Sequence, residues 1–166
     1  MDETLFENLV NTHYEPLYRF ALSLARSEAD AGDLVQQTFY RWAAKGDQLR
    51  DKSKAKSWLF TTLHREFLGQ RRHEDKFPKV EISSMDGEEL PADSPMPEKQ
   101  LDGASVMSAL QRLEETYRAP LALFYLEEHS YRDIAEILEV PIGTVMSRIS
   151  RGKELLRKTI LANEMK

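Results

Sequence analysis

A chain of 166 residues, 41% of them hydrophobic, is long enough for one ordinary domain or for two small helical ones. It contains no cysteine, which excludes disulfides, thiolate metal sites and a cysteine nucleophile. The formal net charge of -5 argues against nucleic-acid binding, but clustered basic residues could still attract phosphate, so the distribution of charge matters more than its sum.

The first 75 residues are predicted to be helical throughout and to form one module. Apolar residues recur at helical spacings between Leu5 and Leu24, and Pro16 between them predicts a break or the first turn of a helix. The start MDETLFENLV lacks the basic flank and apolar stretch of a secretory signal, so we expect a cytoplasmic protein without a membrane-inserted segment.

A second helix is predicted over residues 28–45, capped by Ser27 with Asp30 and closed by Gly46. Its apolar stripe consists of Leu34, Val35, Phe39 and Trp42. The opposite face carries polar side chains without an evident partner in this module, namely Asp33, Gln36, Gln37, Tyr40 and Arg41.

A basic segment follows. Residues 41–76 hold ten basic residues against five acidic ones, whereas residues 1–40 hold two against seven. The loop GDQLRDKSKAK precedes a helix, SWLFTTLHREFLGQRR, with Trp58, Leu59, Leu63 and Phe67 on one side and Arg65, Arg71 and Arg72 on another. We expect Trp58 to belong to the core rather than to a surface on which bases stack.

Residues 76–103 are predicted to be a flexible acidic linker. They hold four of the seven prolines and three basic residues against seven acidic ones, and they show no sustained helical period. The linker separates the module of residues 1–75 from a second module over residues 104–166.

The second module contains the pattern of a helix-turn-helix. Two amphipathic helices, SVMSALQRLEETY and RAPLALFYLEEH, precede a short helix over residues 131–138, for which Ser130 with Asp133 predicts the N-terminal cap. Pro141 suits the first turn of the next helix, and so short a connection is typical of a unit whose second helix enters the DNA major groove. The residues expected to pack this helix onto its partners are Ile142, Val145, Ile149 and Leu156.

Between residues 140 and 158 the basic residues outnumber the acidic ones five to one. The candidate DNA-contacting residues of this helix are Thr144, Met146, Ser147, Arg148, Ser150, Arg151 and Lys153. A guanidinium such as that of Arg148 or Arg151 can bond guanine O6 and N7 in a bidentate way. A basic helix face can also be merely solvated, and the charge pattern alone leaves both readings open.

Three stretches in order resemble one family. SYRDIAEILEVPIGTVMSRISRGKELLRK resembles the promoter-binding C-terminal region of extracytoplasmic-function sigma factors of the sigma-70 family. DLVQQTFYRWA and SWLFTTLHREFLGQRR resemble the N-terminal region of that family. The resemblance implies an all-α fold of two small helical domains, a region 2 type bundle and a region 4 type helix-turn-helix, joined by a flexible acidic linker.

The resemblance also implies a role for each surface. Asp33, Gln36, Gln37 and Tyr40 match the face that binds the clamp helices of core RNA polymerase. The loop and the helix after it match the part that melts and reads the minus-ten promoter element, usually by capturing a flipped base, and Lys52, Ser53, Lys54 and Lys56 are expected to line that pocket or hold phosphate. The minus-ten candidates on the helix itself are Arg65, Arg71 and Arg72, and the residues on the helix over 142–158 match the readers of the minus-thirty-five element.

Two residues depart from the family's pattern. Arg65 stands where many relatives have asparagine, and Met146 stands where the family often has lysine or arginine. The implied partners are core RNA polymerase, promoter DNA and an anti-sigma factor, without a small-molecule substrate.

No enzyme, cofactor or metal is expected. The sequence has no phosphate-binding loop and no HExxH motif, and its four histidines are dispersed. EEH at 127–129 and HED at 73–75 suggest a metal ligand set, but adjacent helical residues point apart, so we expect solvated charges. The alternative function is a stand-alone helix-turn-helix regulator that binds a palindromic operator without polymerase.

Overall fold

The computed structural model describes residues 3–76 and 103–164, and the regular elements in these two ranges are all helices. The expected all-α fold is confirmed. The N-terminal module comprises α1 (Glu3–Ala25), α2 (Glu28–Lys45), two short 3-10 turns (Gly46–Gln48 and Lys52–Lys54) and α3 (Ala55–Lys76). The C-terminal module comprises α4 (Gly103–Arg112), α5 (Glu115–Leu121), a π-helical turn (Ala122–Leu126), α6 (Tyr131–Leu138) and α7 (Ile142–Glu164).

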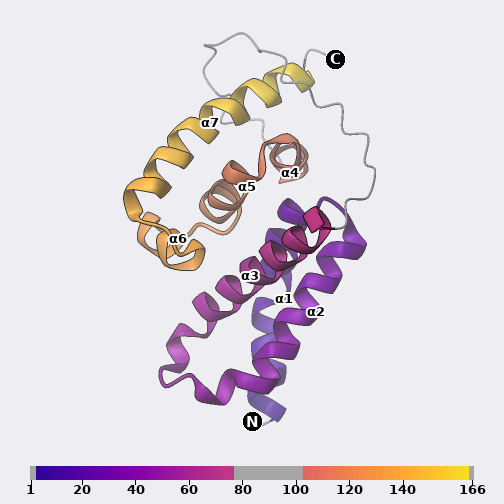
Figure 1. Cartoon of the computed structure of the whole chain (residues 1–166), viewed down its shortest axis with the longest axis vertical. Helices are drawn as coiled ribbons and strands as arrows, with labels where there is room; N and C mark the ends of the chain where they lie inside the picture. Colours follow the sequence, from indigo (N-terminus) through magenta and orange to yellow (C-terminus); the bar gives the residue numbers. More distant parts are fainter. Residues whose placement is uncertain (1–2, 77–102, 165–166) are drawn as a thin grey trace.

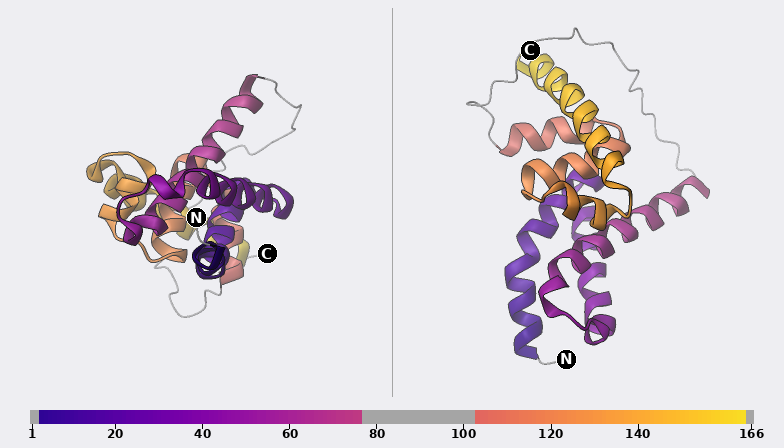
Figure 2. Two further views of the ribbon diagram at one scale, coloured as in Figure 1. Left: turned by 90° about the horizontal axis from the view of Figure 1, so that it is seen from below. Right: turned by 90° about the vertical axis from the view of Figure 1, so that its left-hand side faces the viewer.

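The two modules lie at opposite ends of the molecule and contact each other along α1 and α3 (Figures 1 and 2). α7 runs along the outside of the C-terminal module, and the α6–α7 turn approaches α3 (Figure 1). The predicted linker lies outside the described residues, apart from its two end residues, Lys76 and Gly103, which are helical.

α1 is continuous from Glu3 to Ala25, so the predicted break at Pro16 is wrong. Proline removes one backbone hydrogen bond from a helix interior, at a cost of about 3 kcal/mol. The residues just after it, Leu17 and Phe20, are fully buried, and each buried side chain of this size contributes about 1.5–3 kcal/mol. Packing therefore offsets the local cost and carries the helix through the proline.

α2 forms as the sequence predicts. The Ser27 side chain accepts a hydrogen bond from the Asp30 backbone N–H at 3.2 Å, and the helix ends at Lys45. Its predicted apolar stripe is buried against α1 and α3. Trp42 is completely buried and meets the half-buried Trp58 edge to face, with ring centroids 5.1 Å apart. Trp58 thus packs against the core as expected, but it is not fully buried and also lines the hollow between α2 and α3 described below.

The helix-turn-helix forms from α6 and α7. The Ser130 side chain accepts a hydrogen bond from the Asp133 backbone N–H at 3.1 Å, which confirms the predicted cap. Pro141 lies one residue before α7 rather than in its first turn, and its carbonyl accepts from the N–H groups of Thr144 and Val145. The helix expected over residues 118–129 begins earlier, at Glu115, and its last part is the π-helical turn.

One close contact fixes how α7 sits on α5. A Cβ atom built on Gly152 would lie 2.9 Å from Leu121 Cδ1 and 3.2 Å from Tyr117 Cβ, so any larger residue would force these neighbours to shift. Val145, Ile149 and Leu156 are buried as predicted. Ile142 is 49% exposed, so its predicted core position is wrong.

Candidate nucleic-acid interface

The sequence predicts the outer face of α7 as the DNA-contacting surface. Five of its seven predicted residues are exposed there, namely Met146, Ser147, Ser150, Arg151 and Lys153. Thr144 and Arg148 are half-buried. Because burial of Val145 and Ile149 and the contact at Gly152 fix the rotation of α7, the exposed side chains stay outside the module. This surface can offer hydroxyls, two cations and a large apolar side chain to a groove of DNA.

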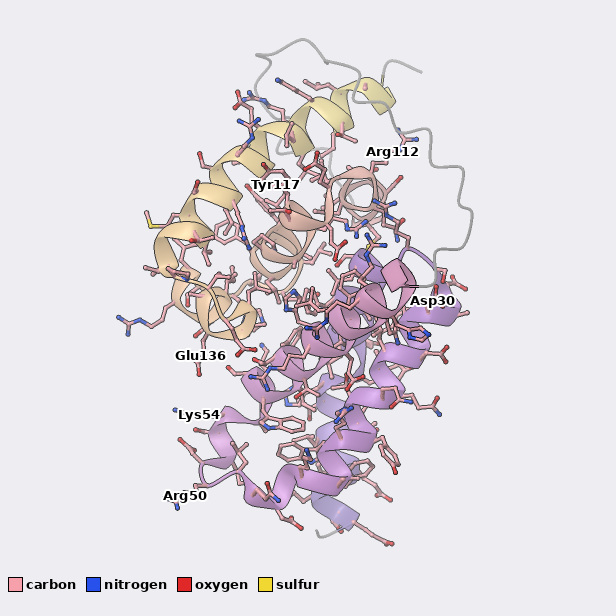
Figure 3. All side chains as sticks on the ribbon, in the orientation of Figure 1. Asp30, Arg50, Lys54, Arg112, Tyr117 and Glu136 are labelled. Carbon is pink, nitrogen blue, oxygen red and sulfur yellow. The ribbon has the colours of Figure 1, made fainter. Side chains whose placement is uncertain are left out.

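The basic loop between α2 and α3 is tied together by its own side chains. Asp51 accepts hydrogen bonds from the Ser53 backbone N–H at 3.0 Å and from the Ser53 hydroxyl at 2.6 Å, and these bonds hold the pKa of Asp51 below its ordinary value. The Lys52 ammonium donates to the Gly46 carbonyl at 2.9 Å and lies 5.6 Å from the centre of the Trp42 ring. Arg50 and Lys54 extend outward from the loop (Figure 3).

A hollow of about 610 Å³ lies between α2 and α3. Its basic lining residues are Arg41, Lys45, Arg65 and Arg72. Trp58, Leu49 and Thr62 contribute apolar and hydroxyl surface, and Arg41 forms an ion pair with Glu66 inside the hollow. The four loop residues predicted to line a pocket, Lys52, Ser53, Lys54 and Lys56, are exposed and do not line this one. A cationic hollow with an aromatic side chain in its wall suits a single-stranded nucleotide.

The polar face of α2 is exposed as predicted. Asp33, Gln36, Gln37 and Tyr40 all lie on it, and Tyr40 is 72% exposed. Arg41, on the same face, differs from them because it pairs with Glu66 of α3. A tyrosine with this much exposed area, beside two amide side chains, forms a surface suited to a protein partner.

The two modules meet through an ion pair that uses a predicted minus-ten residue. The Arg65 guanidinium donates to both carboxylate oxygens of Glu139, at 2.6 and 2.8 Å. This pairing lowers the pKa of the Glu139 carboxyl and raises that of Arg65. Glu139 is the residue that follows α6, and its backbone φ of 59° lies in the left-handed region that favours glycine. The ion pair with Arg65 therefore forms from a backbone conformation that costs free energy for a glutamate.

A second ion pair joins α1 to the π-helical turn. Arg19 donates to both oxygens of Glu127, at 3.1 and 2.8 Å, and the Glu127 side chain is only 2% exposed. Burial still raises the pKa of Glu127 above its ordinary value, although Arg19 opposes this effect. His129 is also buried and meets the Phe60 ring edge to face at 5.0 Å. The expectation that residues 127–129 are solvated is therefore wrong for Glu127 and His129.

Further contacts continue this interface. The Gln111 amide donates to the Leu22 carbonyl at 3.0 Å, and Arg71 donates to Glu115 at 2.8 Å. Sequence reasoning missed all these interface partners because each pair joins residues far apart in the chain. Charge alone could not show which acidic residue lies opposite which arginine.

A cavity of about 320 Å³ lies between the modules beside Leu24, Phe67 and Leu138. Arg148 and His64 also line it, so this predicted DNA reader of α7 turns toward the N-terminal module rather than outward. Burial lowers the pKa of His64 to about 4, with a smaller contribution from the positive charge of Arg148 and opposition from Glu139. The imidazole is thus neutral near pH 7.

Neither a metal site nor a membrane span is found in the parts of the chain that the structure describes. Residues 3–76 and 103–164 contain no cluster of three or more side chains that could hold a metal ion. No helix within these ranges is both long and apolar enough to cross a bilayer.

Family models match both modules of the chain, and the similar proteins are sigma factors. Residues 9–77 match sigma-70 region 2, and residues 104–156 match sigma-70 region 4. The chain is 31% identical to the ECF RNA polymerase sigma factor SigL of Mycobacterium tuberculosis, covering 96% of this chain and 90% of SigL. It is 27% identical to SigW of Bacillus subtilis with the same coverages. It is 33% identical to SigE of Mycolicibacterium smegmatis, of which it spans 60%.

A solved structure has a similar fold. It is the sigma factor RpoE of Bartonella quintana in complex with the anti-sigma factor NepR, with a TM-score of 0.73 and 33% sequence identity. The similarity covers 93% of this chain and 95% of RpoE, so it includes both modules.

Proposed function

The chain belongs to the extracytoplasmic-function sigma factors of the sigma-70 family, and we propose that its two modules divide the recognition of a promoter between them. Residues 1–75 bind core RNA polymerase and the minus-ten element, and residues 104–166 bind the minus-thirty-five element. The observation that carries this proposal is that the molecule has both an exposed polar face on α2 and an exposed, basic outer face on α7.

The outer face of α7 reads the minus-thirty-five element. Its N-terminal turns present Met146, Ser147 and Ser150 to base edges, and Arg151 and Lys153 follow within the next turn. Arg148 joins them only after the interface between the modules opens, because it now lines the cavity there.

The loop after α2 and the hollow beside it hold the minus-ten element. The exposed cations of the loop attract single-stranded phosphate, and the hollow takes a base or sugar against Trp58. Extruding a base costs a few kcal/mol, which contacts of this kind must offset. Arg72 lines the hollow, and Arg65 reaches DNA once it leaves Glu139.

The polar face of α2 binds the clamp helices of core polymerase, and an anti-sigma factor is the proposed inhibitor. The relative of known structure was solved with such a factor, and its similarity to this chain covers both modules, which supports this part of the proposal. The protein acts in the cytoplasm, where polymerase works, and performs no covalent chemistry of its own. A stand-alone regulator would leave the region 2 match and the α2 face without a use.

The test is run-off transcription with purified core polymerase and this chain on a library of genomic promoters. We expect a defined set of transcripts that core polymerase alone does not make. No stimulated transcript, or equal operator binding with and without polymerase in a gel shift, would reject the proposal.

A further inference from the structure

Two large apolar side chains lie exposed, one turn apart, at the start of α7. Ile142 is 49% exposed and Met146 is 51% exposed. Side chains four residues apart on a helix are neighbours, with Cβ atoms about 5–6 Å apart. They therefore form one small apolar patch on the first two turns of the recognition helix.

The patch cannot turn into the core of its own module. Val145 and Ile149 already fill the inner side of these turns, and both are buried. Gly152 holds α7 against Leu121 and Tyr117 without room for a Cβ atom, so the helix cannot rotate to bury Met146. The exposure of the patch thus follows from the packing of the module.

The surroundings of the patch favour DNA over a protein as the occupant. The exposed Ser147, Ser150 and Arg151 lie beside it on the same outer face, which gives hydroxyls and positive charge. Two half-exposed side chains form only a small patch, whereas a protein docking site typically exposes a contiguous apolar surface of a few hundred Å² or more. In the major groove, the apolar group available to such a patch is the 5-methyl group of thymine.

We propose that Ile142 and Met146 contact thymine methyl groups in the minus-thirty-five element and so specify A·T pairs at one or two of its positions. This inference rests on the proposed function, because it takes the outer face of α7 as the surface that enters the groove. It goes further by naming the chemical group that is read and by assigning a role to Ile142, which the sequence placed in the core.

The test uses the full chain bound to core polymerase. The preferred minus-thirty-five element is first selected from promoter DNA that is randomised at these positions. Each thymine in the selected element is then replaced by deoxyuridine, which removes only the methyl group. We expect the wild-type complex to lose about fourfold in affinity at one or two positions, the effect of leaving one methyl group uncovered.

The variants Ile142→Ala and Met146→Ala identify which side chain is responsible. Each should bind thymine and deoxyuridine equally well at its own position while keeping discrimination elsewhere. Lys153→Ala is the matched comparison in the same helix, and it should weaken binding to both DNAs by the same factor. Circular dichroism melting of each variant confirms that it is folded, and alanine is favourable at these exposed helical positions.

The possible outcomes distinguish failure of the methyl-contact proposal from failure of the proposed promoter-binding function. If no complex forms and no element is selected, the proposed function fails. If an element is selected but contains no thymine, or if deoxyuridine changes nothing, the methyl-contact proposal is overturned while promoter binding stands. Variants that lose polymerase binding on every DNA would show that the patch docks onto protein instead, and this too would overturn it.

Discussion

At the scale of single residues, the contact at Gly152 allows a sharp prediction. Gly152→Ala places a methyl group within 2.9 Å of Leu121, a fully buried side chain, and within 3.2 Å of Tyr117 Cβ. Overpacking of this kind costs about 1–3 kcal/mol, and alanine's better helix propensity returns up to about 1 kcal/mol. We expect a lower free energy of unfolding by urea denaturation. Gly143→Ala is the control, because nothing lies within 4 Å of its Cβ position and its stability should be unchanged or slightly higher.

His64 makes stability depend on pH. Burial lowers the pKa of its folded state to about 4, below the ordinary value of 6.5, so the unfolded chain binds the proton more readily. The free energy of unfolding should therefore fall as pH decreases from 6.5 toward 4, by roughly 2–3 kcal/mol from this residue. Denaturation curves at several pH values measure the slope.

The matched variant for this prediction is His64→Gln, which keeps a polar side chain but cannot titrate. Its stability should vary less over the same interval. Burial also lowers the pKa values of His13 and His129, and raises that of Glu127, so the wild-type slope alone is a sum of effects. An equal slope in wild type and variant would show that His64 does not contribute.

At the scale of helices, the sequence predicts best what depends on local chemistry. The caps at Ser27 and Ser130 form because each needs only a side chain and a backbone N–H three residues away. Pro16 and Ile142 were misplaced because their outcome depends on packing. Helical periodicity puts Ile142 on the inner side of α7 but does not show that the first turn of the helix is uncovered.

The proposed role of the polar face of α2 in binding core polymerase can be tested by substitution. The double variant Gln36→Ala with Gln37→Ala changes two exposed side chains, so the free energy of unfolding should stay within about 0.5 kcal/mol of wild type. Core polymerase affinity should fall, because these amides are proposed to face the clamp helices. Pull-down and fluorescence titration measure it. Gln70→Ala on α3, also exposed, should bind normally, and normal capture of the double variant would refute the assignment.

At the scale of the whole molecule, two functional modules could be recognised from the sequence, but their packing could not. Arg19 lies 108 residues before Glu127, and Arg65 lies 74 residues before Glu139. No local pattern connects such residues, and each would look solvated when considered alone. The candidate site is therefore partly engaged in contacts between the modules that only the structure reveals.

This packing conflicts with the proposed simultaneous binding of the two modules to two promoter elements. Their names place the elements about 25 base pairs apart, which is roughly 85 Å of DNA at 3.4 Å per base pair. In the structure Arg65 touches Glu139, the residue that joins α6 to the turn before α7. Under the proposed function, the modules must separate for α3 and α7 to reach these elements together. We therefore expect the ion pairs between the modules to oppose promoter engagement.

The ion pair between the exposed Arg19 and the buried Glu127 should control this separation. Arg19→Ala leaves the Glu127 carboxylate buried without its partner, and losing a charged hydrogen bond of this kind costs about 1.5–3 kcal/mol. Separation of the modules lets water reach the carboxylate, so the variant should populate separated modules more often.

Spin labels attached to Arg50→Cys and Glu136→Cys measure the distance between the modules, and because the chain has no cysteine of its own, no other site is labelled. The free wild-type chain should give one short distance, and Arg19→Ala should add longer ones. Arg132→Ala, the removal of an exposed arginine from α6, should leave the distribution unchanged. Identical distributions for wild type and Arg19→Ala would mean that this pair does not hold the modules together.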